Sequence, residues 1–284
     1  MNIIMKEAKI IILAGQSNAV GVGWTKYLPQ SFNETEIARF KEGYDKILIS
    51  YTSHDIKSEG FVKTAVNCTE RSKDTLGPEV GIAKKLTEKY PDEEFFIVKC
   101  AVGGVNLHND WRSPSSGVPY EAEKNAVLPE SIVDPRVRFP GWCYNEMIKR
   151  LTSSIAELEK MGYSPKVIAF CWMQGESDTG NPICAEPYIE RYDCLLKDLR
   201  ETFAPYFAPD CRYIDAGISD IWANYDQMNA RKKAYAESKG YCYIDTLAEG
   251  LTTKNEPVEN PDTAHYDCES TVRLGEMFGE LITV

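Results

Sequence analysis

The stretch Lys9–Ala19 reads Lys-Ile-Ile-Ile-Leu-Ala-Gly-Gln-Ser-Asn-Ala and decides the fold. After its lysine, the segment Lys9–Ala14 is apolar and largely β-branched without polar alternation, which is typical of a strand buried on both faces. A polar turn containing Ser17 follows directly. Strands covered on both faces are typical of parallel sheets, in which ligands bind beyond the carboxyl ends of the strands.

Short apolar runs alternate with longer amphipathic stretches along the rest of the chain. Tyr144–Leu158 and Tyr188–Phe203 carry apolar side chains at steps of three and four, as on one face of a helix. Further helices are expected after Gly77, with Pro78 in the first turn, and over Glu269–Leu281. The other expected strands are Lys46–Tyr51, Phe95–Ala101, Val167–Trp172, Arg212–Gly217 and Tyr241–Asp245. This alternation predicts an α/β fold with a mostly parallel central sheet.

We expect the 284 residues to form a single domain, 1–284. A chain of this length can hold two average domains, but α/β folds often reach it as one, and no repeat or linker divides the sequence. Residues 106–141 are rich in proline and lack a helical or strand pattern. An irregular stretch of this length is usually functional. We therefore expect it to be an insertion near the active site, at the carboxyl ends of the strands.

Composition and charge exclude several classes of function. The chain is 43% hydrophobic and 26% charged, as in ordinary water-soluble domains. Asp and Glu total 43 against 32 Lys and Arg, for a net charge of −11, so nucleic acids and anionic membranes are disfavoured as partners. The apolar run Ile10–Ala14 is far too short to span a bilayer. Residues 1–9 contain Lys6, Glu7 and Lys9 and do not resemble a signal peptide.

Cysteine and histidine usage bears on compartment and cofactors. The nine cysteines form no Cys-x-x-Cys pair, and several, such as Cys100 and Cys171, lie in apolar runs. Such residues behave as small buried hydrophobes, so we expect reduced thiols and a cytoplasmic location. The chain has only three histidines, which disfavours a His-rich metal centre. We therefore expect no metal centre of this kind, and nothing in the sequence indicates an oligomeric state.

The first chemical motif is Gly15-Gln16-Ser17-Asn18-Ala19, at the end of the first strand. There a serine hydroxyl faces a ligand, and the N–H groups at a helix start stabilise developing negative charge. A lone serine at this position is more often a helix cap. Two other known motifs are absent here. Ala19 stands where the Gly-x-Ser-x-Gly motif of α/β-hydrolases has its last glycine, and Lys26 stands where a dinucleotide-binding motif has its third glycine.

Two further motifs follow two of the expected strands. Gly103-Gly104 allows close backbone approach and outward N–H groups, as an oxyanion hole requires, although such a pair is often a plain turn. Trp172–Asp178 reads Trp-Met-Gln-Gly-Glu-Ser-Asp. In it, the Gln174 amide can donate to an oxyanion and Glu176 can orient a histidine. The alternative is a polar loop in which Glu176 or Asp178 caps a helix.

The fourth motif, Asp262-Thr263-Ala264-His265, comes near the end of the chain. Histidine is the side chain best suited to act as a base near neutral pH. A carboxylate three residues earlier can hold its Nδ1–H while Nε2 faces a hydroxyl, which is the arrangement of hydrolytic triads. A histidine in an ordinary surface loop is an equally common alternative.

Together and in this order, the four motifs resemble the SGNH-hydrolase superfamily. They resemble more closely its sialate O-acetylesterase and acetylxylan-esterase branch, carbohydrate esterase family 6, over residues 9–281. The resemblance implies a three-layer α/β/α, flavodoxin-like fold. It also implies a cofactor-free serine esterase that removes O-acetyl groups from an acetylated carbohydrate.

The resemblance also implies roles for individual residues. Ser17 matches the nucleophile and His265 the general base. Asp262 matches the usual triad acid, and Glu176, an acid also considered in this branch, is the second choice. The oxyanion donors that it implies are the N–H groups of Ser17 and Gly104 and the side-chain amide of Gln174, which stands where most of the superfamily has Asn.

The substrate and the reaction leave alternatives open. Trp24, Trp111 and Trp142 fall near the expected rim, where aromatic rings can stack on sugars, although large aromatic residues are more often part of the core. His108 can line the pocket but is more readily a loop residue. An esterase for longer acyl chains and a non-catalytic carbohydrate-binding relative remain alternatives. The scarcity of histidine disfavours a metal-dependent phosphoesterase.

Overall fold

The computed structural model describes residues 5–54, 56–66, 68, 69, 74–117, 140–254, 256 and 262–284. The strands are β1 (Lys6–Gly15), β2 (Gly23–Trp24), β3 (Tyr44–Ser53), β4 (Ile56–Lys57), β5 (Val62–Thr64), β6 (Thr75–Leu76), β7 (Phe95–Ala101), β8 (Tyr163–Met173), β9 (Phe207–Ala216) and β10 (Cys242–Ile244). The helices are α1 (Ser17–Val20), the 3-10 helix η1 (Thr25–Gln30), α2 (Glu34–Glu42), α3 (Pro78–Lys89), α5 (Trp142–Lys160), α6 (Pro182–Ala185), α7 (Tyr188–Thr202), α8 (Tyr225–Lys239) and α9 (Cys268–Leu281).

An eight-stranded sheet forms the centre of the molecule, in the order β10-β9-β8-β1-β7-β3-β4, with β5 also paired to β3. Pairing is parallel from β10 through to β3, while β4 and β5 run antiparallel to β3. Strands β7, β1, β8, β9 and β10 follow the 2-1-3-4-5 order of flavodoxin-like sheets, and β3 is added outside β7. The predicted α/β fold with a mostly parallel sheet is confirmed.

Strand β1 lies at the middle of this sheet because its side chains are apolar on both faces. Every residue of Ile10–Ala14 is fully buried. Ile12 is in register with Val98 of β7 on one side and Phe170 of β8 on the other. Burying an isoleucine side chain contributes about 1.5–3 kcal/mol. The apolar strand therefore fixes its own carboxyl end, Gly15, at the centre of the sheet's carboxyl edge.

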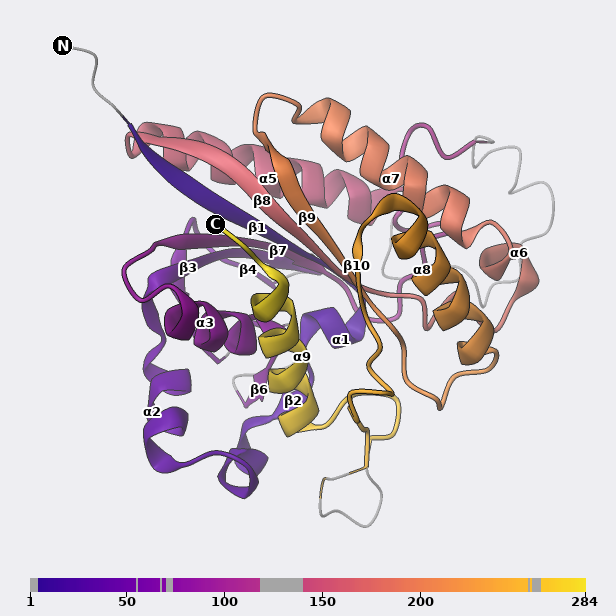
Figure 1. Ribbon diagram of the computed structural model, residues 1–284, viewed down its shortest axis with the longest axis horizontal. Helices are drawn as coiled ribbons and strands as arrows, with labels where there is room; N and C mark the ends of the chain where they lie inside the picture. Colours follow the sequence, from indigo (N-terminus) through magenta and orange to yellow (C-terminus); the bar gives the residue numbers. More distant parts are fainter. Residues whose placement is uncertain are drawn as a thin grey trace.

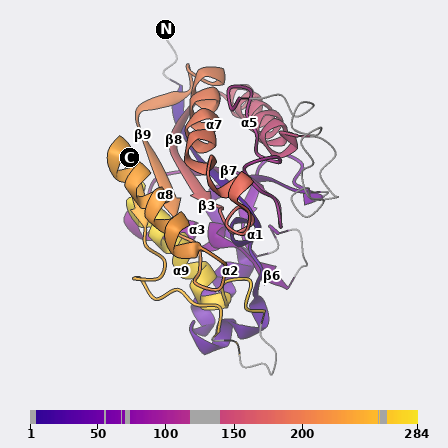
Figure 2. The same cartoon turned by 90° about the vertical axis from the view of Figure 1, so that its right-hand side faces the viewer.

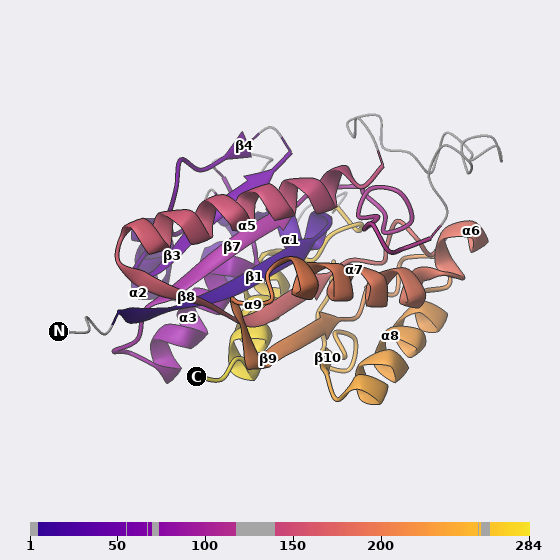
Figure 3. The same cartoon turned by 90° about the horizontal axis from the view of Figure 1, so that it is seen from above.

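Helices cover both faces of the sheet. Helices α5 and α7 lie on one face, and α3 and α9 on the other (Figure 1); α8 packs beside α7 and against β10. Seen from above, β1 and β9 run in the same direction, and the chain continues from β1 into α1 (Figure 3). Figure 2 looks toward that end of the molecule, with α1 near the middle. The three predicted layers are therefore present.

Part of the sequence interpretation falls outside the described residues. The expected insertion over 106–141 is described only at 106–117 and 140–141, and the rest of it lies outside. All nine cysteines are described, and none of them forms a disulfide. Among the helices that the structure describes, none is both long and apolar enough to cross a membrane.

Candidate active site

The turn between β1 and α1 presents Ser17. Gly15 has φ +147°, and a Cβ there would lie 1.9 Å from the carbonyl oxygen of Met173, so only glycine allows this approach. The Gln16 N–H donates to the same Met173 oxygen at 3.0 Å. These contacts hold the turn against the end of β8, and Ser17 itself is 7% exposed. The predicted nucleophile therefore lies at the centre of the carboxyl edge, as the sequence indicates.

Two backbone N–H groups lie in neighbouring turns at this edge. Among the described residues, neither the Ser17 N–H nor the Gly104 N–H has a hydrogen-bond acceptor. Ser17 begins α1, and the first N–H groups of a helix have no partner within it. Gly104, at φ +77°, lies in the exposed turn after β7. The Val102 N–H donates to Gly15 at 3.3 Å and so joins the two turns. This edge can therefore offer donors to a developing oxyanion.

The third predicted donor, the Gln174 amide, belongs to a buried network. Its Nε2 donates to Asp178 Oδ2 at 2.5 Å and to Gln16 Oε1 at 3.2 Å, and Val105 O lies at 3.4 Å. Gln16 Oε1 also accepts the Ser177 N–H at 3.1 Å. Three acceptors thus surround the two amide hydrogens of Gln174. Its side chain orders the turn around Ser17. That the Gln174 amide donates a hydrogen bond to an oxyanion stays a prediction.

Asp178 ties the loop after β7 to the loop after β8. Its fully buried carboxylate accepts the N–H groups of Leu107, at 3.0 Å, and His108, at 3.3 Å. Burial raises the pKa of this carboxyl to about 6, against the lowering effect of these hydrogen bonds and that from Gln174. His108 is itself buried. From the sequence, helix capping was the one role considered for Asp178, because its partners come from a loop 70 positions away.

Asn18 joins the segments that carry Ser17, Glu176 and the Asp262–His265 pair. Its Nδ2 donates to Glu176 Oε1 at 2.8 Å, and its Oδ1 accepts the Tyr266 N–H at 3.0 Å. Asn18 follows Ser17 directly, and Tyr266 follows His265, so one buried amide links turns that are 248 positions apart. Sequence reasoning missed this residue. Its presence in the Gly-Gln-Ser-Asn motif was the only available signal, since both partners are distant in the chain.

The Glu176 carboxyl is buried next to charged and polar groups that act on its pKa. Burial raises the pKa of the Glu176 carboxyl, while the Asn18 hydrogen bond and the nearby Lys232 and His265 act to lower it. The hydrogen bond that Glu176 accepts from a side chain comes from Asn18. Glu176 therefore holds the Asn18 amide in place, and the His265 imidazole contributes to the electrostatic environment of its carboxyl group.

His265 and Asp262 form a local pair. His265 Nδ1 and Asp262 Oδ2 are 2.8 Å apart, and Asp262 Oδ1 also accepts the Ala264 N–H at 3.1 Å. With Nδ1 engaged, the imidazole has its Nε2 left for another group. Of the two carboxylates considered from the sequence, Asp262 is thus the one hydrogen-bonded to the histidine. The His265 side chain is 13% exposed, so solvent and substrate can reach it.

The aromatic residues expected at the rim divide into two kinds. Trp111 follows the core alternative, because it is fully buried and packs edge-on against Trp172 with 5.1 Å between ring centroids. The apolar ring is more stable in this core than at a wet rim. Trp24 and Trp142 are partly exposed. Within the described residues, no group of three or more His, Cys, Asp or Glu side chains is arranged to hold a metal ion.

A family model described as carbohydrate esterase, sialic acid-specific acetylesterase matches residues 7–283. The chain belongs to this family. The protein is therefore a carbohydrate esterase of the acetylesterase type, and the resemblance inferred from the four motifs is confirmed at this level. A search of curated proteins found no match.

Solved structures with the same fold accompany this family match. The acetylesterase is similar to a protein from Arabidopsis thaliana (20% identity, 97% of each chain covered, TM-score 0.61). It is also similar to NanS (14% identity, 97% of this chain and 96% of that one, TM-score 0.61). A third is a carbohydrate acetylesterase from Xanthomonas citri (14% identity, 95% of this chain and 55% of that one, TM-score 0.58). At these identities the similarity establishes the fold.

Proposed function

We propose that the protein is a serine esterase that removes O-acetyl groups from a carbohydrate of the acetylxylan or sialate type. The observation that carries the proposal is the pair of Asn18 hydrogen bonds, which hold the Ser17 turn and the His265 turn together. The 2.8 Å contact between His265 and Asp262 adds the orientation that a catalytic imidazole needs. Family membership supplies the acetylated carbohydrate as the substrate class.

The reaction proceeds in two acyl-transfer steps. His265 Nε2 takes the Ser17 hydroxyl proton as Oγ attacks the acetyl carbonyl carbon. The tetrahedral oxyanion accepts hydrogen bonds from the Ser17 and Gly104 N–H groups and from the Gln174 amide, which turns one hydrogen from its present acceptors. His265 then protonates the departing sugar oxygen and leaves an acetyl-serine. A water molecule, deprotonated by His265, hydrolyses this ester and releases acetate.

Asp262 is the triad acid in this proposal, and Glu176 acts through Asn18. The carboxylate of Asp262 stabilises the imidazolium that forms when His265 takes the proton. Glu176 is nearly fully buried and accepts from the Asn18 amide, so it fixes the turn that bears the nucleophile. Asp262→Asn should therefore lower kcat more strongly than Glu176→Gln.

Covalent labelling tests the nucleophile. A serine-directed fluorophosphonate should add one group at Ser17, located by mass spectrometry, and Ser17→Ala should abolish both this label and hydrolysis of p-nitrophenyl acetate. The matched control is Ser153→Ala, an exposed serine on α5 that donates to Arg150. Full activity in Ser17→Ala would refute the scheme. No label and no hydrolysis in the wild type would favour the non-catalytic carbohydrate-binding alternative.

Acyl-chain length and chelation separate the remaining alternatives. An acetylesterase should lose activity along a series of p-nitrophenyl esters from acetyl to octanoyl, whereas a longer-chain esterase should gain it. Activity should be insensitive to EDTA, because the proposed steps use only side chains and backbone N–H groups. Membership in carbohydrate esterase family 6 stays a prediction, as do the sugar and the position of its acetyl group.

A further inference from the structure

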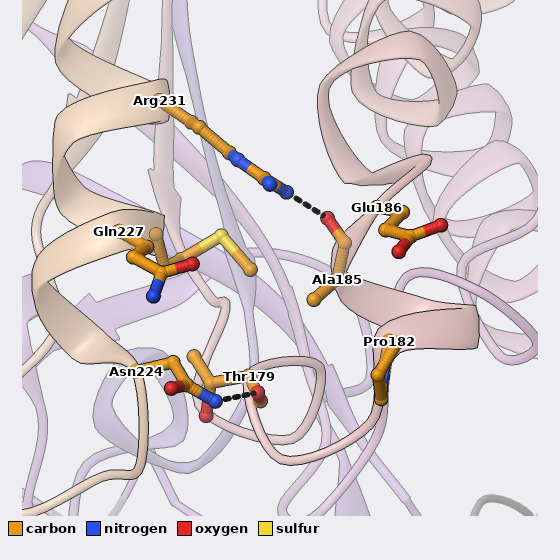
Figure 4. Close-up of a pocket in the computed structure, with 8 residues that line it drawn as sticks. Thr179, Pro182, Ala185, Glu186, Asn224, Gln227 and Arg231 are labelled. Carbon is orange, nitrogen blue, oxygen red and sulfur yellow. Dashed lines mark hydrogen bonds between the residues drawn. The ribbon is translucent and has the colours of Figure 1, made fainter.

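A pocket with a volume of about 160 Å³ lies between α6 and α8. Figure 4 shows Asn224, Gln227 and Arg231 on the α8 side, with Thr179, Pro182, Ala185 and Glu186 across from them. A cavity that holds a single water needs only about 10–15 Å³ of such volume. The pocket is therefore large enough for a bulkier polar group than a water molecule.

One wall of the pocket is formed by the loop after β8, which also carries Glu176 of the proposed active site. Thr179 follows Asp178 in the loop after β8, and its Oγ1 donates to the Glu176 carbonyl oxygen at 3.1 Å. On the other side, Asn224 Nδ2 donates to the Thr179 carbonyl oxygen at 3.2 Å. The segments after β8 and β9 thus meet at this pocket, beyond the carboxyl ends of both strands, where α/β sheets bind ligands.

Two side chains of the lining are fixed before any ligand binds. Asn224 has φ +56°, a left-handed conformation that non-glycine residues rarely adopt, and its bond to Thr179 holds it there. Arg231 Nη1 donates to the Ala185 carbonyl oxygen at 2.8 Å and so spans the pocket. Its remaining N–H groups, the Asn224 Oδ1 and the Gln227 amide are available for hydrogen bonds. Fixed polar groups cost less entropy on binding.

The lining chemistry indicates the class of ligand. Met228, Pro182 and Ala185 supply apolar surface between the polar groups, which is the mixture that a sugar ring presents through its C–H and O–H groups. The two charged side chains of the lining, Glu186 and Arg231, have opposite signs. An anionic sugar therefore gains little net attraction here, and a neutral sugar fits the charge better.

We propose that this pocket is a subsite for a neutral, hydroxyl-bearing sugar residue of the acetylated substrate, next to the residue that is deacetylated. Arg231 and Gln227 donate to its hydroxyls, and Asn224 Oδ1 accepts from one. The inference rests on the proposed esterase activity and deepens it by naming where the rest of the carbohydrate binds.

Binding without hydrolysis gives the first test. Titration calorimetry measures the affinity of unacetylated xylotriose for the wild type, Arg231→Ala and Gln227→Ala. Each variant should weaken binding about tenfold, since a hydrogen bond involving a charged group or buried in a site is worth about 1.5 kcal/mol. The matched control is Arg273→Ala, whose guanidinium also donates to a backbone carbonyl, Glu249 O at 2.7 Å, but outside the pocket. Equal affinities in all four proteins would overturn the proposal.

Kinetics give the second test and separate the two proposals. The measured quantity is the ratio of kcat/KM for acetylated xylotriose to that for p-nitrophenyl acetate, which lacks a sugar. Arg231→Ala should lower this ratio about tenfold, and Arg273→Ala should leave it unchanged. The same ratio is measured with O-acetylated N-acetylneuraminic acid in place of acetylated xylotriose. If Arg231→Ala lowers the ratio for this anionic sugar and not for xylotriose, the neutral-sugar assignment is refuted. A wild type that hydrolyses neither ester refutes the esterase proposal, whereas an active one with an unaltered ratio refutes the subsite alone.

Discussion

At the scale of single residues, Asn18 has the most consequential contacts in this molecule. A serine and a histidine far apart in sequence can cooperate only if their turns are held in a fixed relation. The Asn18 amide supplies this relation with one donor bond to Glu176 and one acceptor bond to the Tyr266 N–H. All three residues are nearly fully buried, so water does not compete for these bonds.

Asn18→Ala should therefore lower kcat about 100-fold on p-nitrophenyl acetate with a much smaller change in KM, because a displacement near 1 Å of reacting groups has an effect of this size. Steady-state kinetics measure it. Asn18→Asp should recover little, since it places a second carboxylate against Glu176. The control is Asn33→Ala, which removes the N-cap of α2. It should cost about 1 kcal/mol of stability and leave kcat unchanged. Equal kcat losses in both variants would assign Asn18 a purely structural role.

At the scale of helices and strands, apolar periodicity predicted the buried elements and missed the polar ones. All six expected strands overlap observed ones, and α3, α5, α7 and α9 lie where the pattern indicated. Helix α8 was not predicted, because one of its few buried side chains is Lys232 and the rest of the helix is largely polar. The edge strands β4 and β5 were also missed, since they are short and mostly exposed. Periodicity detects only elements that bury a continuous apolar face.

Contact between α3 and α9 depends on glycine. A Cβ on Gly275 would lie 1.9 Å from the Pro78 carbonyl oxygen, so Gly275→Ala should separate the two helices and destabilise the protein by about 1–3 kcal/mol. Urea denaturation measures the change. The control is Gly180→Ala, where an added Cβ meets nothing within 4 Å. Equal stability of the two variants would show that the helix pair tolerates wider spacing.

At the scale of the whole molecule, a buried lysine joins the carboxyl ends of β8 and β9. Lys232 Nζ donates to the carbonyl oxygens of Gln174, at 2.5 Å, and Ala216, at 2.6 Å, and lies 3.1 Å from Asp215 Oδ1. Burial raises the pKa of Asp215 to about 6, while Lys232 acts to lower it. This contact connects α8, and with it one wall of the pocket, to the loop that carries Glu176.

Lys232→Met should cost about 3–5 kcal/mol of stability, because it leaves a buried carboxylate without its cation. Adding Asp215→Asn should restore part of that loss. Thermal unfolding of the two variants at pH 7 measures both effects. At pH 4, below the raised pKa, Asp215 is protonated in the folded protein, so the Lys232→Met deficit should shrink. A deficit of the same size at both pH values would contradict the ion-pair explanation.

The sequence by itself determined the central strand, the α/β class and the positions of Ser17, Gly104, Gln174, Glu176 and His265 after strands or in a late turn. It also determined the pairing of Asp262 with His265, because that contact is local. Only the tertiary structure decided that Gln174 is held by Asp178 and Gln16, that Trp111 is core and that Asn18 bridges to Glu176 and Tyr266. Periodicity and local turns are encoded within a few residues, whereas the partner of a buried polar group depends on which distant segments the packed sheet brings together.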